Sequence, residues 1–198
     1  DTTFGMASRL FKPEQEDGFL TKVLKEEGAI IFTKSNLPQA LLAYDSINNI
    51  FGEAKNPWDQ TRSTGGSSGG EGGLVAARCS PLGVGNDLGG SIRFPAHCCG
   101  IVGFKPTLER VTTAGTGRLS QSMDNLMVNG MCVGPLAKSV RDAELFMKAM
   151  LSERAHERFK LSEKDPYYIR KDWQENLVQK TKTQKLRIGY FKKHELFP

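Results

Sequence analysis

The sequence of 198 residues lacks any apolar run close to the ~18 residues that a membrane-spanning helix requires, and we expect no secretory signal peptide. It contains only three histidines and four cysteines, and the cysteines form neither a C-x-x-C pair nor a cluster with histidine. We therefore expect no metal site and no cofactor. Without a secretory signal, the cysteines are interpreted as reduced packing residues of an intracellular protein.

A strong excess of charge of one sign is also missing. The net charge of +5 comes entirely from residues 151–198, because basic and acidic residues are equal in number over residues 1–150. In the tail the two signs alternate, as between Arg154 and Arg158. This pattern is typical of a solvated surface and not of a nucleic-acid groove. We therefore expect no nucleic-acid partner, and we interpret residues 152–185 as a polar surface excursion.

What the sequence does contain is an alternation of helix and strand patterns, which favours an α/β fold. Apolar residues at helical spacing predict a helix over residues 17–27 that ends at Gly28, and residues 29–32 predict a buried strand. Pro38 predicts the first turn of a short helix that continues to Tyr44. Residues 186–191 predict a further strand.

A longer helix is predicted after Ser139, which resembles an N-cap with Asp142 three residues later. Its apolar stripe consists of Val140, Ala143, Phe146, Met147 and Met150. Such a stripe is typical of a helix that packs on a core.

Residues 65–103 differ sharply in composition, with twelve of the 21 glycines and only four charged residues. A flexible linker would be polar throughout, whereas residues 74–77 and 101–102 are apolar and need burial. We therefore predict a buried, glycine-lined catalytic loop in place of a linker.

A first serine turn, at residues 65–69, matches G-x-S-x-G, the nucleophile elbow of α/β-hydrolases. That fold needs a strand directly before the elbow, but residues 56–64 are polar and interrupted by a proline. It also needs a histidine in a suitable downstream loop, and His97, His156 and His194 are the only histidines. The elbow is therefore the weaker hypothesis.

A second serine turn places Gly89 and Gly90 directly before Ser91. Backbone N–H groups of such a turn can form an oxyanion hole. A serine hydroxyl needs a neighbour that takes its proton. His97 is the histidine nearest in sequence, although a structural role is more common for a lone histidine. The alternative base is a neutral lysine acting through another hydroxyl.

Three stretches, at residues 65–72, 80–96 and 99–107, together resemble the signature of the amidase signature hydrolases. The similarity extends to residues 28–36 and 134–143 and so covers residues 1–151. The pattern is most similar to the animal branch that hydrolyses fatty acid amides. The resemblance implies part of one amidase signature domain over residues 1–198, with a mixed central sheet covered by helices on both faces. The catalytic core would be residues 65–107.

The same resemblance implies a Ser-Ser-Lys relay. Ser91 would be the nucleophile, Ser67 the bridging hydroxyl and Ser68 a supporting residue. In this family the peptide before the bridging serine is cis, which here is the Gly66-Ser67 bond. The nucleophile would form an acyl-enzyme while the amide or ester bond of the substrate breaks.

Substrate contacts follow from the resemblance as well. The backbone of Leu88, Gly89, Gly90 and Ser91 would form the oxyanion hole, and the chain near Leu41 would line the approach of the substrate. The family's catalytic lysine belongs to a segment that would precede Asp1. We therefore expect this chain to be a fragment that is largely inactive by itself.

We expect a lipid amide as substrate, a homo-oligomeric assembly and, for the parent protein, association with membranes. Two alternatives remain open. One is another amidase signature enzyme that acts on small amides or serves as an amidotransferase subunit. The other is a non-catalytic binding domain that keeps the glycine-rich loops for structure alone.

Overall fold

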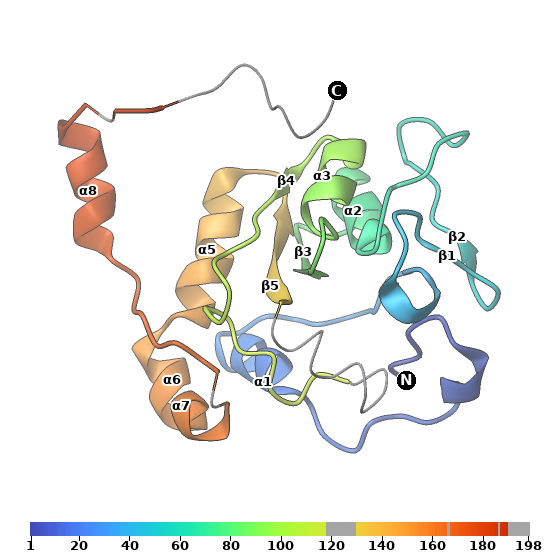
Figure 1. Ribbon diagram of the computed structural model, residues 1–198, viewed down its shortest axis with the longest axis horizontal. Helices are drawn as coiled ribbons and strands as arrows, with labels where there is room; N and C mark the ends of the chain where they lie inside the picture. The colour runs from blue at the N-terminus through green and yellow to red at the C-terminus, as the bar shows by residue number, and fades with distance from the viewer. Residues whose placement is uncertain (118–129, 166, 186, 190–198) are drawn as a thin grey trace.

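The computed structural model describes residues 1–117, 130–165, 167–185 and 187–189, and it centres on a three-stranded antiparallel sheet (Figure 1). The strands are β3 (Leu82–Asp87), β4 (Val102–Gly103) and β5 (Cys132–Ala137), in the order β3-β5-β4. Leu82 pairs with Ala137 and Asp87 with Cys132. A separate antiparallel pair joins β1 (Ile47–Asn48) to β2 (Gly52–Glu53).

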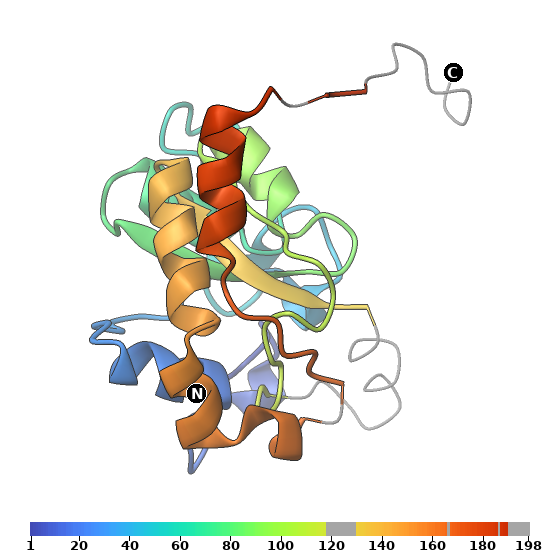
Figure 2. The same ribbon diagram turned by 90° about the vertical axis from the view of Figure 1, so that its left-hand side faces the viewer.

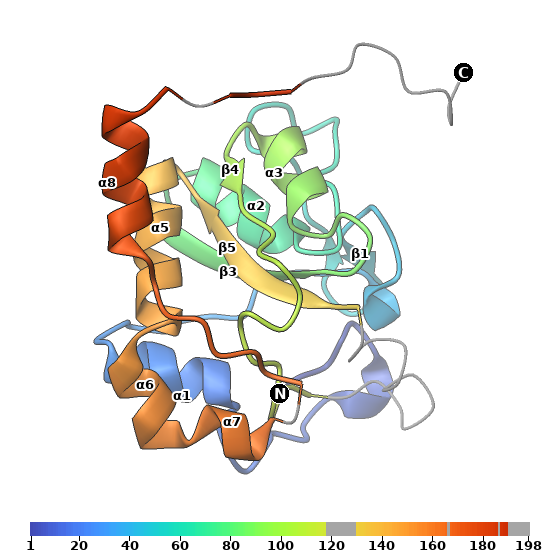
Figure 3. The same ribbon diagram turned by 60° about the vertical axis from the view of Figure 1, so that its left-hand side comes forward.

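Helices lie on both sides of the sheet, with α5 against one face and α2 and α3 against the other (Figures 1 and 3). This arrangement confirms the predicted α/β class. The helical elements are η1 (Ala7–Arg9), α1 (Phe19–Glu26), η2 (Gln39–Leu41), α2 (Gly69–Ala76), α3 (Arg93–Cys99), α5 (Val140–Met150), α6 (Glu153–Phe159), α7 (Leu161–Lys164) and α8 (Glu175–Thr183).

The larger core lies between α1, α5 and the sheet. Val23 and Leu24 of α1 pack there with the buried face of α5, which confirms both amphipathic helices. The hydroxyl of Ser139 accepts a hydrogen bond from the Asp142 N–H at 3.2 Å, as expected of an N-cap. The assignment of Val140 to the apolar stripe is wrong, because Val140 is the first residue of α5 and is 72% exposed.

On the opposite face of the sheet, Ile92, Ala96 and Leu136 form a smaller core. Close approach of β3 to the start of α2 depends on Gly85. A Cβ atom at that position would lie 2.5 Å from the Ser68 Oγ, which is shorter than any ordinary contact. Glycine is therefore required for the helix to sit on this strand.

Two predicted elements of the N-terminal region are wrong. Residues 29–32 form no strand, and Ile30 is 89% exposed. A strand needs a neighbour for its backbone hydrogen bonds, and no described strand runs beside this segment. The helix expected to reach Tyr44 is only the short η2, because Ala40 and Leu41 adopt left-handed φ angles of 58° and 65°.

At the C-terminal end, residues 152–185 form α6, α7 and α8, and the first two of these helices are not entirely at the surface. Ala155 and Leu161 are buried, and Arg154 pairs with Glu26 of α1 at 2.7 Å. Figure 2 shows α6 beside α1. Of the strand predicted at 186–191, residues 187–189 are described and form no strand, while the others lie outside the described residues.

All four cysteines are free. Cys99 and Cys132 are buried, which confirms their packing role, but Cys79 is exposed and was wrongly expected to pack. Over the described residues, no helix has both the length and the apolar character that crossing a membrane demands.

Candidate active site

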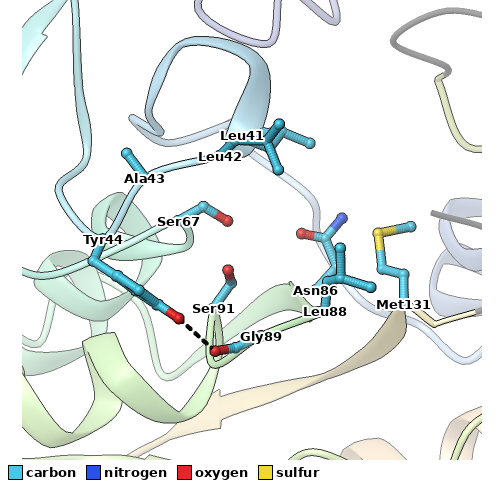
Figure 4. Close-up of a pocket in the computed structure, with 10 residues that line it drawn as sticks. All are labelled: Leu41, Leu42, Ala43, Tyr44, Ser67, Asn86, Leu88, Gly89, Ser91 and Met131. Atoms are coloured by element: carbon cyan, nitrogen blue, oxygen red, sulfur yellow. Dashed lines mark hydrogen bonds between the residues drawn. The ribbon is translucent and has the colours of Figure 1, made fainter. Parts of the chain in front are cut away.

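Four segments that are distant in sequence meet around a cavity of about 240 Å³ (Figure 4). Ser67 comes from the loop before α2, and Ser91 comes from the turn before α3. In Figure 4 the two hydroxyls point toward one another across the cavity. The lining residues are Leu41, Leu42, Ala43, Tyr44, Ser67, Asn86, Leu88, Gly89, Ser91 and Met131.

The buried hydroxyl of Ser46 contacts the loop that carries Ser67 at three points. The Ser46 Oγ lies within donating distance of the carbonyl oxygens of Gly65 (2.9 Å) and Ser67 (3.1 Å), and it accepts from the Gly69 N–H (2.9 Å). The Gly66-Ser67 peptide is cis, as the resemblance implied. These contacts fix the backbone on both sides of Ser67, which is itself buried.

The turn that carries Ser91 is built around the carboxylate of Asp87. This carboxylate accepts from the N–H groups of Gly90 (2.7 Å), Ile92 (3.1 Å) and Arg93 (3.3 Å), and from the Arg93 guanidinium. Burial disfavours the charged carboxylate, but the hydrogen bonds from Arg93 and the backbone outweigh it. The pKa of Asp87 is lowered to about 2. Asp87 is therefore ionised throughout the neutral range and acts as the fixed anchor of the turn.

Ser68 joins the two serine turns and does not line the cavity. Its N–H donates to the Ser91 carbonyl at 3.2 Å, and its hydroxyl donates to the Asn86 carbonyl at 3.4 Å. Its contacts are thus with the backbone around Ser91.

Beside the two facing hydroxyls lie backbone N–H groups that are available as hydrogen-bond donors. Among the described residues, no hydrogen bond engages the N–H groups of Leu88, Gly89 or Ser91. The Gly90 N–H, by contrast, is taken by Asp87. Backbone donors of this kind can stabilise the negative oxygen of a tetrahedral intermediate. The arrangement combines a hydroxyl nucleophile, a second hydroxyl for proton transfer and an anion-binding turn.

Most residues singled out in the sequence meet at this cavity. Ser67, Ser91, Leu41, Leu88 and Gly89 line it together, whereas Ser68 and Gly90 are not among its lining residues.

Sequence reasoning missed Tyr44, Asn86 and Met131, which also line the cavity. Asn86 could have been found, because it lies one residue before the anchor Asp87 in a strand that leads into the turn. Nothing in the sequence signals Met131, which directly precedes β5, the strand that pairs with β3.

Two basic side chains close in sequence to Ser91 lie away from the cavity. His97 is exposed on α3, and the Lys105 Nζ contacts the Pro106 carbonyl (3.0 Å) and the Cys132 Sγ (3.3 Å). No lysine or histidine of the described ranges lines the cavity. The nucleophile-elbow hypothesis is wrong, because no strand of the described chain leads directly into Gly65. The same ranges contain no group of three metal-ligating side chains.

Comparison with known proteins connects this geometry to one family. The family model described as Amidase matches residues 1–198. The chain is 40% identical to fatty-acid amide hydrolase 1 of Sus scrofa, over 96% of this chain and 31% of that protein. It is 36% identical to an acetamidase of Emericella nidulans, over 96% of this chain and 34% of that protein.

A solved structure of a fatty acid amide hydrolase superimposes with a TM-score of 0.77 and 35% identity. The superposition covers 87% of this chain and 29% of that one. The chain thus spans about a third of the length of the relatives that it matches.

Proposed function

The chain belongs to the amidase signature family, and from this premise we propose that it carries the serine machinery of an enzyme that hydrolyses amides. The observation that supports this most is the meeting of Ser67 and Ser91 at one cavity, beside N–H groups that have no partner among the described residues. In this proposal, residues 65–107 are the catalytic core of one amidase domain that includes residues 1–198.

In the proposed reaction, the Ser91 Oγ attacks the amide carbonyl carbon while its proton passes to the Ser67 Oγ. Ser67 in turn gives its own proton to a base. The carbonyl oxygen becomes an oxyanion that accepts hydrogen bonds from the N–H groups of Leu88, Gly89 and Ser91. When the C–N bond breaks, the relay runs in reverse and protonates the leaving nitrogen. Water then hydrolyses the acyl-enzyme on Ser91.

The base in this scheme is a lysine outside residues 1–198, as the family resemblance implies. The described lysines support this assignment because none of them lines the cavity. Burial would keep such a lysine neutral, so the complete enzyme is expected to work best at alkaline pH.

The substrates proposed are fatty acid amides. Leu41, Leu42, Leu88 and Met131 give the cavity a largely apolar wall, which favours an acyl chain over a polar group. Sequence similarity alone does not choose between acyl chains, since an acetamidase is almost as similar as a fatty acid amide hydrolase. Membrane association and homo-oligomerisation remain predictions from the family resemblance.

The nucleophile can be identified with a fluorophosphonate, which reacts covalently with activated serines. The protein should be extended upstream to include the expected lysine, treated with the reagent and mapped by peptide mass spectrometry. We expect an adduct on Ser91 that is absent in Ser91→Ala. In Ser67→Ala the labelling should slow by roughly 100-fold or more, because a proton relay is lost. Ser8→Ala, at an exposed serine of η1, is the matched control.

Two other labelling results would contradict the proposal. An adduct on Ser67 or Ser68 would overturn the assignment of Ser91 as nucleophile. No adduct at all, in a protein that unfolds cooperatively, would favour the non-catalytic binding domain.

The acyl preference can be measured with a series of primary amides from acetamide to long-chain amides. Each buried CH₂ contributes ~0.8 kcal/mol, so kcat/KM should rise about fourfold per methylene until the cavity is filled. A preference for acetamide would assign the protein to the small-amide enzymes instead.

A further inference from the structure

One peptide group of the turn before Ser91 is held at both of its polar ends. The carbonyl oxygen of Gly89 accepts a hydrogen bond from the Tyr44 hydroxyl at 2.9 Å. The N–H of the same peptide, which belongs to Gly90, donates to the Asp87 carboxylate at 2.7 Å. Tyr44 and Asp87 come from different segments, so the Gly89-Gly90 peptide is fixed between two parts of the fold. Figure 4 shows the bond from Tyr44 to Gly89.

This peptide is the part of the turn that most needs external support. It joins two consecutive glycines, which offer no side chain to restrict rotation of the peptide plane. Gly90 also adopts a φ of +128°, a conformation that L side chains rarely take. Rotation of the peptide would break both hydrogen bonds. It would also shift the adjoining N–H groups of Gly89 and Ser91, which are the donors proposed for the oxyanion.

The ring of Tyr44 is itself held in place. It packs edge-on against Phe94 of α3, with ring centroids 5.2 Å apart and an interplanar angle of 61°. The same side chain forms part of the cavity wall. A bound acyl group would therefore shield the Tyr44 hydroxyl from water and strengthen its hydrogen bond to Gly89.

We propose that Tyr44 is a positioning residue for the oxyanion-binding turn, which it orders through the Gly89 carbonyl. This inference rests on the proposed amide hydrolase function. It assigns to the 41–44 segment a role in stabilising the transition state, in addition to lining the substrate cavity.

The test variant is Tyr44→Phe, made in the protein extended upstream to include the expected lysine, which keeps the ring and its packing on Phe94 but removes the hydroxyl. The loss of one hydrogen bond to the turn should lower kcat roughly 3- to 10-fold and leave KM nearly unchanged. A trifluoromethyl ketone, whose adduct with Ser91 places an oxyanion in the turn, should bind more weakly by a similar factor. Tyr167→Phe, which removes a hydroxyl from a half-exposed tyrosine away from the turn, is the matched control.

The outcomes separate this proposal from the proposed function. If the unaltered protein reacts with a fluorophosphonate at Ser91 but Tyr44→Phe keeps full kcat and full affinity for the ketone, the role of Tyr44 is refuted and the function stands. A rise in KM alone would assign Tyr44 to substrate packing and also refute it. If the unaltered protein shows no reaction at Ser91, the proposed function itself fails.

Discussion

Asp87 and Arg93 form a two-point ion pair at the base of the turn that carries Ser91. The Arg93 Nε lies 3.0 Å from the Asp87 Oδ2, and the Nη2 lies 2.9 Å from the Oδ1. The carboxylate is fully buried, while the arginine remains half-exposed. Because the same two oxygens also accept backbone hydrogen bonds, the pair connects a surface charge to the conformation of the turn.

Replacing Asp87 by Asn should destabilise the protein in a pH-dependent way. The folded-state pKa of about 2 lies below the value of about 3.9 for an unfolded aspartate. The stabilisation from Asp87 is therefore fully present above about pH 4 and is lost as the pH falls toward 2. At neutral pH we expect a loss of roughly 2 kcal/mol in the free energy of unfolding. Urea unfolding of both proteins across this range measures the difference.

Asp172→Asn, which alters an exposed aspartate near the C-terminal end, is the control for this titration. If the difference between wild type and Asp87→Asn stayed constant from neutral pH down to pH 2, Asp87 would not have the depressed pKa described above.

Replacing Ser46 by Ala should impair both stability and reactivity. The buried hydroxyl of Ser46 contacts the backbone of Gly65, Ser67 and Gly69. Its removal takes away the described partner of the Ser67 carbonyl and of the Gly69 N–H, and leaves the Gly65 carbonyl with the longer bond from Thr64 at 3.4 Å. We expect a loss of about 1–3 kcal/mol in stability and slower fluorophosphonate labelling of Ser91. Ser80→Ala removes another buried hydroxyl, which bonds to Leu82, and should affect stability alone. Equal labelling rates in the two variants would contradict a role for Ser46 in the site.

Replacing Gly85 by Ala should displace Ser68. The added Cβ would lie 2.5 Å from the Ser68 Oγ and 2.9 Å from the Leu136 Cδ1. Overpacking of this kind costs about 1–3 kcal/mol, which thermal or urea unfolding can measure. Gly189→Ala meets no atom within 4 Å and provides the control. An unchanged stability for Gly85→Ala would show that β3 and α2 tolerate a wider separation than described.

Alkylation by iodoacetamide should distinguish Cys99 from Cys79. Burial raises the pKa of the Cys99 thiol to about 11, so its thiolate is scarce at pH 8 and is also inaccessible. Cys79 is exposed and should be modified first. Peptide mass spectrometry of a time course in native buffer checks the order, and the same reaction in denaturant should remove the difference. Early modification of Cys99 would contradict its burial.

Local patterns in the sequence predicted the two amphipathic helices α1 and α5, but not α2, α3 or α6 to α8. The spacing that brings Val23 and Leu24 to one face, and the N-cap at Ser139, both depend on neighbours within one or two turns of chain. The strand predicted at residues 29–32 does not form. A strand needs a neighbouring strand to pair with, and the residues of the apolar run do not specify that neighbour.

The candidate site could be predicted only in part for the same reason. Ser67 and Ser91 belong to recognisable glycine-rich turns, so the sequence itself points to them. Ser46, Tyr44 and Met131 reach the site through tertiary contacts and stand in segments without a distinctive pattern. The sequence also does not show which N–H groups of the turn are without a partner. Only the three-dimensional arrangement shows that the Gly90 N–H donates to Asp87, whereas the N–H groups of Gly89 and Ser91 have no partner among the described residues.

The hydrogen bond from the Ser68 N–H to the Ser91 carbonyl forms only when the two serine turns are in contact, so this one amide reports on assembly of the site. An amide proton exchanges with deuterated solvent only when its hydrogen bond opens. The exchange rate at the Ser68 nitrogen therefore records how often the two serine turns separate, whether or not any substrate is turned over.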